Sequence, residues 1–125
     1  MKFTLLAVGV AALTATATPS LAQDAAAGAT VFRQCQACHV IDQEQNRVGP
    51  HLVGIVGRPV ASIEGFNYSD AMRAYGEGKV WDAETLSTYL ADPRGVVEGT
   101  RMAYAGVKDP AQLANLIAYL ENPTQ

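Results

Sequence analysis

The chain has 125 residues, of which 49% are hydrophobic and 17% are charged, and its formal net charge is −3. This length accommodates one domain, and the acidic balance argues against a nucleic-acid partner. The sequence has no run of lysine or arginine that would bind an anionic membrane surface.

Residues 1–22 have the pattern of a secretory signal peptide. Lys2 gives a positive start, residues 3–13 form an uncharged apolar run, and Ser20 and Ala22 are small residues at the two positions that a signal peptidase reads. The run is shorter than the roughly 20 apolar residues that a membrane span needs, although an uncleaved anchor remains the alternative. We therefore predict export to the periplasm and one mature domain over residues 23–125.

The first predicted helix spans residues 24–38. Asp24 is suited to cap its N-terminus, because a carboxylate accepts hydrogen bonds from the free N–H groups of a first turn. One apolar stripe recurs at the spacing of a helix face, and it consists of Gly28, Val31, Phe32 and Cys35. Since Gly28 lowers helix propensity, we expect it to allow a close packing contact.

Residues 40–67 show neither helical nor strand periodicity and are broken repeatedly by glycine and proline. An irregular segment of this length is unusual in a compact domain unless it wraps around something. The pattern therefore predicts a buried cofactor.

Three further helices are predicted, over residues 70–75, residues 82–91 and residues 110–121. Their expected N-caps are Ser69, Asp82 and Asp109. Pro93 is expected to end the second of them, and residues 95–107 to form a loop. No strand pattern competes, so the predicted fold is all-α, with few helices and long loops.

Residues 35–39 read Cys-Gln-Ala-Cys-His, which is the attachment motif of c-type haem. Two cysteines three positions apart near a helix end can point the same way, and each thiol can form a thioether with one vinyl group of a haem. His39 is then held where a neutral imidazole nitrogen binds the iron. We therefore predict one covalently bound haem c on Cys35 and Cys38.

Two other kinds of site contain a Cys-x-x-Cys pair. A thioredoxin-like redox pair lies at a helix start after a strand, whereas this motif follows a predicted helix. A zinc site needs four ligands, and the spacing of Cys35, Cys38, His39 and His51 fits a zinc finger poorly. The motif therefore favours haem attachment over both.

A second axial ligand decides what a haem can do, because an open iron position allows catalysis and a filled one favours electron transfer. Met72 falls in a predicted short helix, where a core role is the simpler interpretation. Met102 lies in a glycine-bracketed loop, from which a side chain can reach a cofactor. Position alone leaves a surface methionine at Met102 as the alternative. His51 follows Pro50 and is expected on the His39 side, so it is a poor candidate for a distal acid–base residue.

Residues 28–120 resemble the class I c-type cytochromes, in the branch of cytochrome c2 and mitochondrial cytochrome c. The segments that carry the resemblance, in the order of the family, are CQACH, RVGPHLVGIVGR, FNYSDAM, VWDAETLSTYLADP, GTRMAYAG and NLIAYL. The resemblance implies the class I cytochrome c fold, in which long loops wrap one covalent haem and the N- and C-terminal helices cross. It also implies that Met102 is the sulfur ligand of the iron.

The resemblance implies roles for five further residues around the haem. Pro50 matches the proline whose carbonyl accepts a hydrogen bond from the axial histidine. Arg58, Tyr68 and Trp81 match residues that pair with or hydrogen-bond the haem propionates, and Tyr89 matches the tyrosine near the methionine sulfur. The implied helix crossing brings together Gly28, Phe32, Leu116 and Tyr119.

The function implied by the resemblance is that of a soluble periplasmic electron carrier, not an enzyme, which shuttles single electrons between membrane redox complexes. The implied donor is a cytochrome bc complex. A terminal oxidase, a photosynthetic reaction centre or a periplasmic dehydrogenase is the implied further partner, and we expect a monomer. The alternative is a haem enzyme or a ligand-binding haem protein with an open or labile sixth iron position.

The sequence departs from the family in the ligand loop and in surface charge. Glu98, Arg101 and Tyr104 stand where the family commonly has proline, lysine and phenylalanine. Many relatives dock through a ring of lysines, whereas Lys79 and Lys108 are the lysines beyond residue 22 of this chain. We therefore predict electron transfer with a weaker salt dependence than in lysine-rich relatives.

Overall fold

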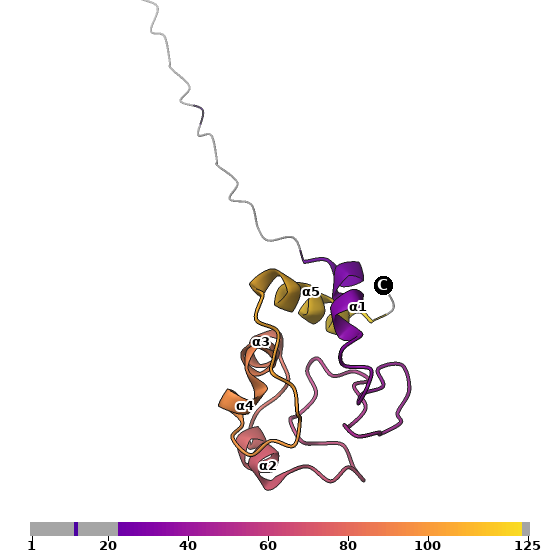
Figure 1. The fold of residues 1–125 in the computed structure, drawn as a ribbon, viewed down its shortest axis with the longest axis vertical. Coiled ribbons are helices and arrows are strands. Elements are labelled where there is room, and N and C mark those ends of the chain that lie inside the picture. The colour runs from indigo at the N-terminus through magenta and orange to yellow at the C-terminus, as the bar shows by residue number, and fades with distance from the viewer. Residues whose placement is uncertain (1–11, 13–22, 124–125) are drawn as a thin grey trace, which may run out of the picture.

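The computed structural model describes residues 12 and 23–123. These residues form five helices, which are α1 (Ala25–Phe32), α2 (Asp70–Gly76), α3 (Ala83–Ala91), α4 (Pro93–Val96) and α5 (Pro110–Glu121) (Figure 1). An isolated bridge joins Pro59 to Val80, and the described part of the chain contains no strand. The predicted all-α fold is therefore confirmed. Within the same residues, no helix has both the length and the apolar character of a membrane span.

The predicted signal segment, residues 1–22, lies outside the described residues except for residue 12. Its cleavage therefore stays a prediction, and so does the boundary of the mature domain after residue 22.

Each helix begins after a side chain that accepts a hydrogen bond from the backbone of its first turn. These caps are Asp24, Ser69, Asp82, Asp92 and Asp109. Asp109 accepts from the N–H groups of Ala111 and Gln112, and Pro110 takes the first helical position, where a missing N–H costs nothing. The predicted starts of α1, α2, α3 and α5 are confirmed.

The predicted end of the first helix is wrong. α1 ends at Phe32, six positions before the predicted end at residue 38. Beyond Phe32 the pattern of backbone hydrogen bonds changes. The N–H of Gln34 donates to Val31 O at 3.3 Å, and the N–H of Cys35 donates to Phe32 O at 2.8 Å. These i to i−3 bonds form turns in place of a continued α-helix.

The segment after Pro93 also differs from the prediction. Pro93 does end α3, but it opens the short helix α4. Asp92 caps this helix by accepting from the N–H of Gly95 at 3.1 Å, and the proline occupies its first turn. An Asp-Pro pair is a helix-start signal as well as a stop signal, and here it acts as both.

The helices α1 and α5 cross at one end of the molecule (Figure 1). Gly28 lies so close to α5 that a Cβ placed on it would be 2.8 Å from the Cβ of Tyr119. The rings of Phe32 and Tyr119 are 5.2 Å apart, and Phe32 and Leu116 are each only 1% exposed. The crossing and its four predicted residues are therefore confirmed.

The long segment between α1 and α2 is irregular but is bonded to the residues before α3. The N–H of Gly57 donates to Trp81 O, and the N–H of Trp81 donates to Arg58 O, both at 2.8 Å. Val60 donates in the same way to Lys79 O at 3.0 Å. These bonds hold Arg58 beside Trp81, whose side chain is buried in the core.

Candidate functional site

Cys35, Cys38 and His39 lie on the tight turn that follows α1. The N–H groups of Cys38 and His39 both donate to the carbonyl of Cys35, at 3.1 and 2.9 Å. The two thiols are free and half-buried. Because α1 is anchored on α5, this turn starts from a fixed base.

His39 is held by the chain on one side and keeps one free ring nitrogen. Its Nδ1 lies 2.7 Å from the carbonyl oxygen of Pro50, and since a carbonyl can only accept, Nδ1 carries the proton. The Nε2 of the neutral ring then keeps its lone pair. Burial lowers the pKa of His39, the Pro50 bond opposes this, and the charge of Arg58 lowers the pKa further. The neutral ring, which is the form that binds a metal, is therefore favoured.

The cysteine pair does not have the electrostatics of a thiol redox centre. Burial, with a smaller contribution from Cys38, raises the pKa of the Cys35 thiol to about 11. A reactive thioredoxin-like cysteine has a lowered pKa, because the thiolate is the nucleophile. The thioredoxin-like alternative is therefore not favoured.

Met102 lies in the loop between α4 and α5 and is half-buried against the core. The hydroxyl of Tyr89, from α3, donates to its sulfur at 3.8 Å. The N–H of Met102 donates to Thr100 Oγ1 at 3.3 Å. The sulfur thus points inward, which is not the arrangement of a surface-loop methionine.

Arg58 has an unpaired donor in a buried position. Its Nη1 donates to the carbonyls of His51 and Val53, at 3.0 and 3.2 Å. Its Nε is buried and has no hydrogen-bond partner among the described residues. Burial lowers the pKa of this guanidinium, which nonetheless stays charged. A buried charged donor is costly without an acceptor, so an acceptor from outside the chain is expected here.

Three aromatic rings form a stack that ends at the Met102 sulfur. Trp81 lies 5.0 Å from Tyr89 and 6.2 Å from Tyr75, measured between ring centroids.

Tyr68 is buried, and its hydroxyl accepts a hydrogen bond from the N–H of Ile63 at 3.0 Å, which leaves its own proton to donate.

The zinc alternative is not supported. Among the described residues, no group of three or more His, Cys, Asp or Glu side chains is placed to hold a metal ion. His51 is buried and has local partners instead. Its N–H donates to Asn46 Oδ1 at 2.9 Å, and its Nδ1 accepts from the N–H of Val53 at 3.3 Å.

Sequence reasoning missed three features of this site. Gly49 packs against the His39 ring with no room for a side chain. The side chains of Arg101 and Tyr104, on either side of Met102, reach partners elsewhere in the chain. A glycine before a proline looks like any loop glycine, and no local pattern identifies partners that lie far away in the sequence.

The family model of cytochrome c matches residues 25–123. The chain belongs to the cytochrome c family. It is 44% identical over 117 residues to cytochrome c2 of Blastochloris viridis, which covers 93% of this chain and 91% of that relative. It is 48% identical over 98 residues to cytochrome c-550 of Ancylobacter novellus, covering 77% and 92%. The solved structure of cytochrome cH from Methylobacterium extorquens is similar, with a TM-score of 0.72, 41% identity and coverage of 78% and 97%.

These relationships establish the fold and the kind of function. The chain has the class I cytochrome c fold, carries a covalently bound haem c and is an electron carrier, not an enzyme. The relatives named cytochrome c2 and cytochrome c-550 give no support to the alternative of a haem enzyme.

The residues present fit a haem c. The Cys-x-x-Cys-His turn offers two free thiols and an imidazole with a free Nε2. Met102 offers a thioether sulfur that points inward. The unpaired Nε of Arg58 is a donor suited to a haem propionate.

Proposed function

We propose that Cys35 and Cys38 form the two thioethers to the haem and that His39 and Met102 are the axial ligands of its iron. The observation that carries the proposal is the 2.7 Å bond between His39 Nδ1 and the Pro50 carbonyl. This bond fixes the tautomer, so that Nε2 is the nitrogen left for the iron. Met102 supplies the soft sulfur that holds the other position.

The remaining residues orient these ligands and neutralise charge. Pro50 orients His39, and Tyr89 orients the Met102 sulfur through its hydroxyl. Arg58, Tyr68 and Trp81 hold the haem propionates, with the free Nε of Arg58 and the hydroxyl proton of Tyr68 as donors. Partners of this kind are needed wherever a carboxylate is removed from water.

When bound, the haem supplies an iron that takes up and releases one electron. The chain's own contribution is to keep both axial positions filled, so that no substrate reaches the metal. A methionine sulfur favours the reduced iron, and an apolar surrounding adds to this effect. The sulfur ligand and the apolar surrounding both raise the reduction potential of the iron, so that the protein accepts electrons readily.

We also propose where the protein works and with what. Residues 1–22 direct export and are cleaved, and the mature domain acts as a soluble monomer in the periplasm. A cytochrome bc complex donates electrons to it, and a terminal oxidase or a photosynthetic reaction centre accepts them. A periplasmic dehydrogenase is the further partner that this chemistry allows.

Electron exchange with membranes tests this function. Membranes with a cytochrome bc complex and quinol are expected to reduce the ferric protein, and membranes with the oxidase or the reaction centre to reoxidise it through repeated turnovers. Testing the terminal oxidase, the photosynthetic reaction centre and the periplasmic dehydrogenase separately identifies the physiological partner. A ferrous protein that binds carbon monoxide readily, or one that no bc complex reduces, would contradict the proposal.

Export and attachment are tested by the mass of the protein recovered from the periplasm of a bacterial host. The expected mass is that of residues 23–125 plus one haem, and gel filtration should give a monomer. A mass that retains residues 1–22 would support the membrane anchor instead.

A further inference from the structure

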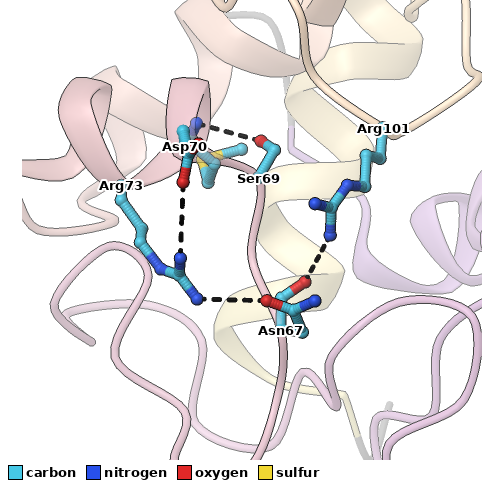
Figure 2. Close-up of polar contacts among 6 residues, drawn as sticks. Asn67, Ser69, Asp70, Arg73 and Arg101 are labelled. Atoms are coloured by element: carbon cyan, nitrogen blue, oxygen red, sulfur yellow. Dashed lines mark hydrogen bonds and ion pairs between the residues drawn. The ribbon is translucent and has the colours of Figure 1, made fainter.

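The side chains on either side of Met102 both reach out of their loop. Arg101 Nη1 donates to the backbone carbonyl of Asn67 at 2.8 Å, and the two residues are 34 positions apart (Figure 2). Tyr104 hydroxyl donates to Gln34 Oε1 at 2.9 Å, across 70 positions. Met102 is therefore flanked by two long-range bonds that run to different parts of the chain.

The first anchor, Asn67, is itself held in place. Arg73 Nη2 donates to its side-chain Oδ1 at 3.2 Å, so that two arginines converge on one residue (Figure 2). Arg73 also pairs with Asp70 at 3.5 Å. Asn67 lies two residues before Ser69, the cap of α2, which accepts from the N–H of Met72 at 3.0 Å. Asn67 is thus held in place by Arg73 of the adjacent helix α2.

The second anchor, Gln34, lies on the turn that carries the thiols. Its N–H bonds to Val31 O at 3.3 Å, and Cys35 follows it directly. This turn continues from α1, which packs on α5. Tyr104 therefore ties the Met102 loop to the residue directly before the attachment motif.

The loop between the two bonds has little to hold it otherwise. Residues 101–106 contain no helix, and their backbone N–H bonds are short-range, from Met102 to Thr100 Oγ1 and from Tyr104 to Met102 O; the next backbone bond to another part of the chain is from Val107 N–H to Leu90 O at 2.8 Å. Within residues 23–123, the sulfur has one hydrogen bond, from the Tyr89 hydroxyl at 3.8 Å. Segments with few backbone bonds and exposed surroundings open most easily, so side-chain anchors decide how this loop behaves.

We propose that Arg101 and Tyr104 are positioning residues that form a two-point clamp, which holds the Met102 loop closed and sets how easily an outside ligand displaces the sulfur. This inference rests on the proposed role of Met102 as an iron ligand. Both residues act through the loop between them, because their side chains are bonded to Asn67 and Gln34.

Imidazole is a suitable probe, because it binds ferric haem iron only when the sixth position opens, so its apparent affinity reports the opening of the loop. We expect Arg101→Ala to raise the apparent affinity of the holoprotein roughly fivefold and Tyr104→Phe about threefold, in line with the loss of one exposed hydrogen bond each. The double variant should approach the product of the two changes, since the anchors are separate.

Two further variants make the test specific. Arg101→Lys keeps a donor that reaches the Asn67 carbonyl and should restore most of the wild-type affinity at neutral pH. Arg94→Ala removes an equal charge from α4, where Arg94 is exposed and makes no side-chain contact within the described residues, and should leave the affinity unchanged. Circular dichroism at the assay temperature verifies that every variant is folded.

The outcomes distinguish failure of the proposed clamp from failure of the proposed role of Met102 as an iron ligand. If Met102→Ala binds imidazole far more tightly than wild type, while Arg101→Ala and Tyr104→Phe match wild type, the clamp is wrong and the ligand role stands. Failure of Arg101→Lys to restore the affinity also overturns the clamp. If Met102→Ala binds no more tightly than wild type, the ligand role of Met102 fails first.

Discussion

The His39 ring fits between two consecutive residues, Gly49 and Pro50. The carbonyl of Pro50 accepts its Nδ1 proton, while Gly49 lies flat against the ring. A Cβ on Gly49 would be 2.7 Å from Nδ1 and 2.9 Å from Nε2, which is closer than Cβ atoms approach in proteins. The glycine is therefore required by the close approach of the ring and not by its own backbone conformation.

Gly49→Ala should displace the His39 ring and weaken its bond to Pro50. We expect the free energy of unfolding to fall by about 1–3 kcal/mol, the usual cost of overpacking. Chemical denaturation of the holoprotein measures this directly. Val48→Ala is the matched control, because the Val48 side chain is 79% exposed and should change little. Equal stability of Gly49→Ala and wild type would mean that the ring has room to move.

The residues proposed to attach the haem could be predicted from a local motif, but the long-range hydrogen bonds that hold the Met102 loop could not. Cys35, Cys38 and His39 stand in one short motif, and the thiols and the free imidazole nitrogen that it promises are present. Arg101 and Tyr104 were noticed only as departures from the family. Their partners lie 34 and 70 positions away, and such pairings arise only once the chain has folded.

At the scale of elements, the molecule depends on the crossing of α1 and α5. Gly28 allows the two helices to approach so closely that a methyl group there would overlap the backbone of Asn115. Asn115 Oδ1 also accepts from the N–H of Asp24 at 2.9 Å, which ties the start of α1 to α5. This crossing fixes the base from which the Cys35 turn begins.

Gly28→Ala separates packing from helix propensity. Alanine favours an isolated helix by about 1 kcal/mol over glycine, so propensity alone predicts a gain in stability. The structure predicts the opposite, a loss of about 1–3 kcal/mol from overpacking at the crossing, measured by denaturant unfolding. Ala26→Ser, on the exposed face of the same helix, is the control. A more stable Gly28→Ala protein would show that the contact between α1 and α5 has room for a methyl group.

The starts of α1, α2, α3 and α5 were predictable because each has a side-chain cap, whereas two other boundaries were not. No glycine or proline occurs between Phe32 and Gly49, so no helix-stop residue marks the end of α1 before its i to i−3 turns. At Pro93 the sequence carries a stop and a start together, and only the packing of the chain shows that both are used.

At the scale of the whole molecule, the surface has few lysines for steering. Beyond residue 22 the lysines are Lys79 and Lys108, whose Nζ groups donate to Tyr75 O at 2.8 Å and to Ala91 O at 2.7 Å. The full chain has 9 basic and 12 acidic residues, so no strong positive field surrounds it. Encounters with partners should then depend more on contact at the docking face than on long-range attraction.

The rate of electron transfer should therefore respond weakly to salt. We expect the second-order rate constant with a cytochrome bc complex to fall by less than about threefold between roughly 0.02 and 0.2 M salt, since the protein has no strong positive field for salt to screen. Stopped-flow kinetics measures it, with a lysine-rich cytochrome c as the control in the same assay. A steep decline equal to that of the control would contradict the expectation.

The most direct test of the whole interpretation is the red absorption spectrum of the ferric protein. Iron bound by methionine sulfur gives a weak band at about 695 nm. We expect wild type to show this band, Met102→Ala to lose it, and Met72→Ala, which removes the other methionine of residues 23–125, to keep it. A wild-type protein without the band, whose reduced form binds carbon monoxide readily, would mean that the sixth position is open and that the protein is not the closed electron carrier described above.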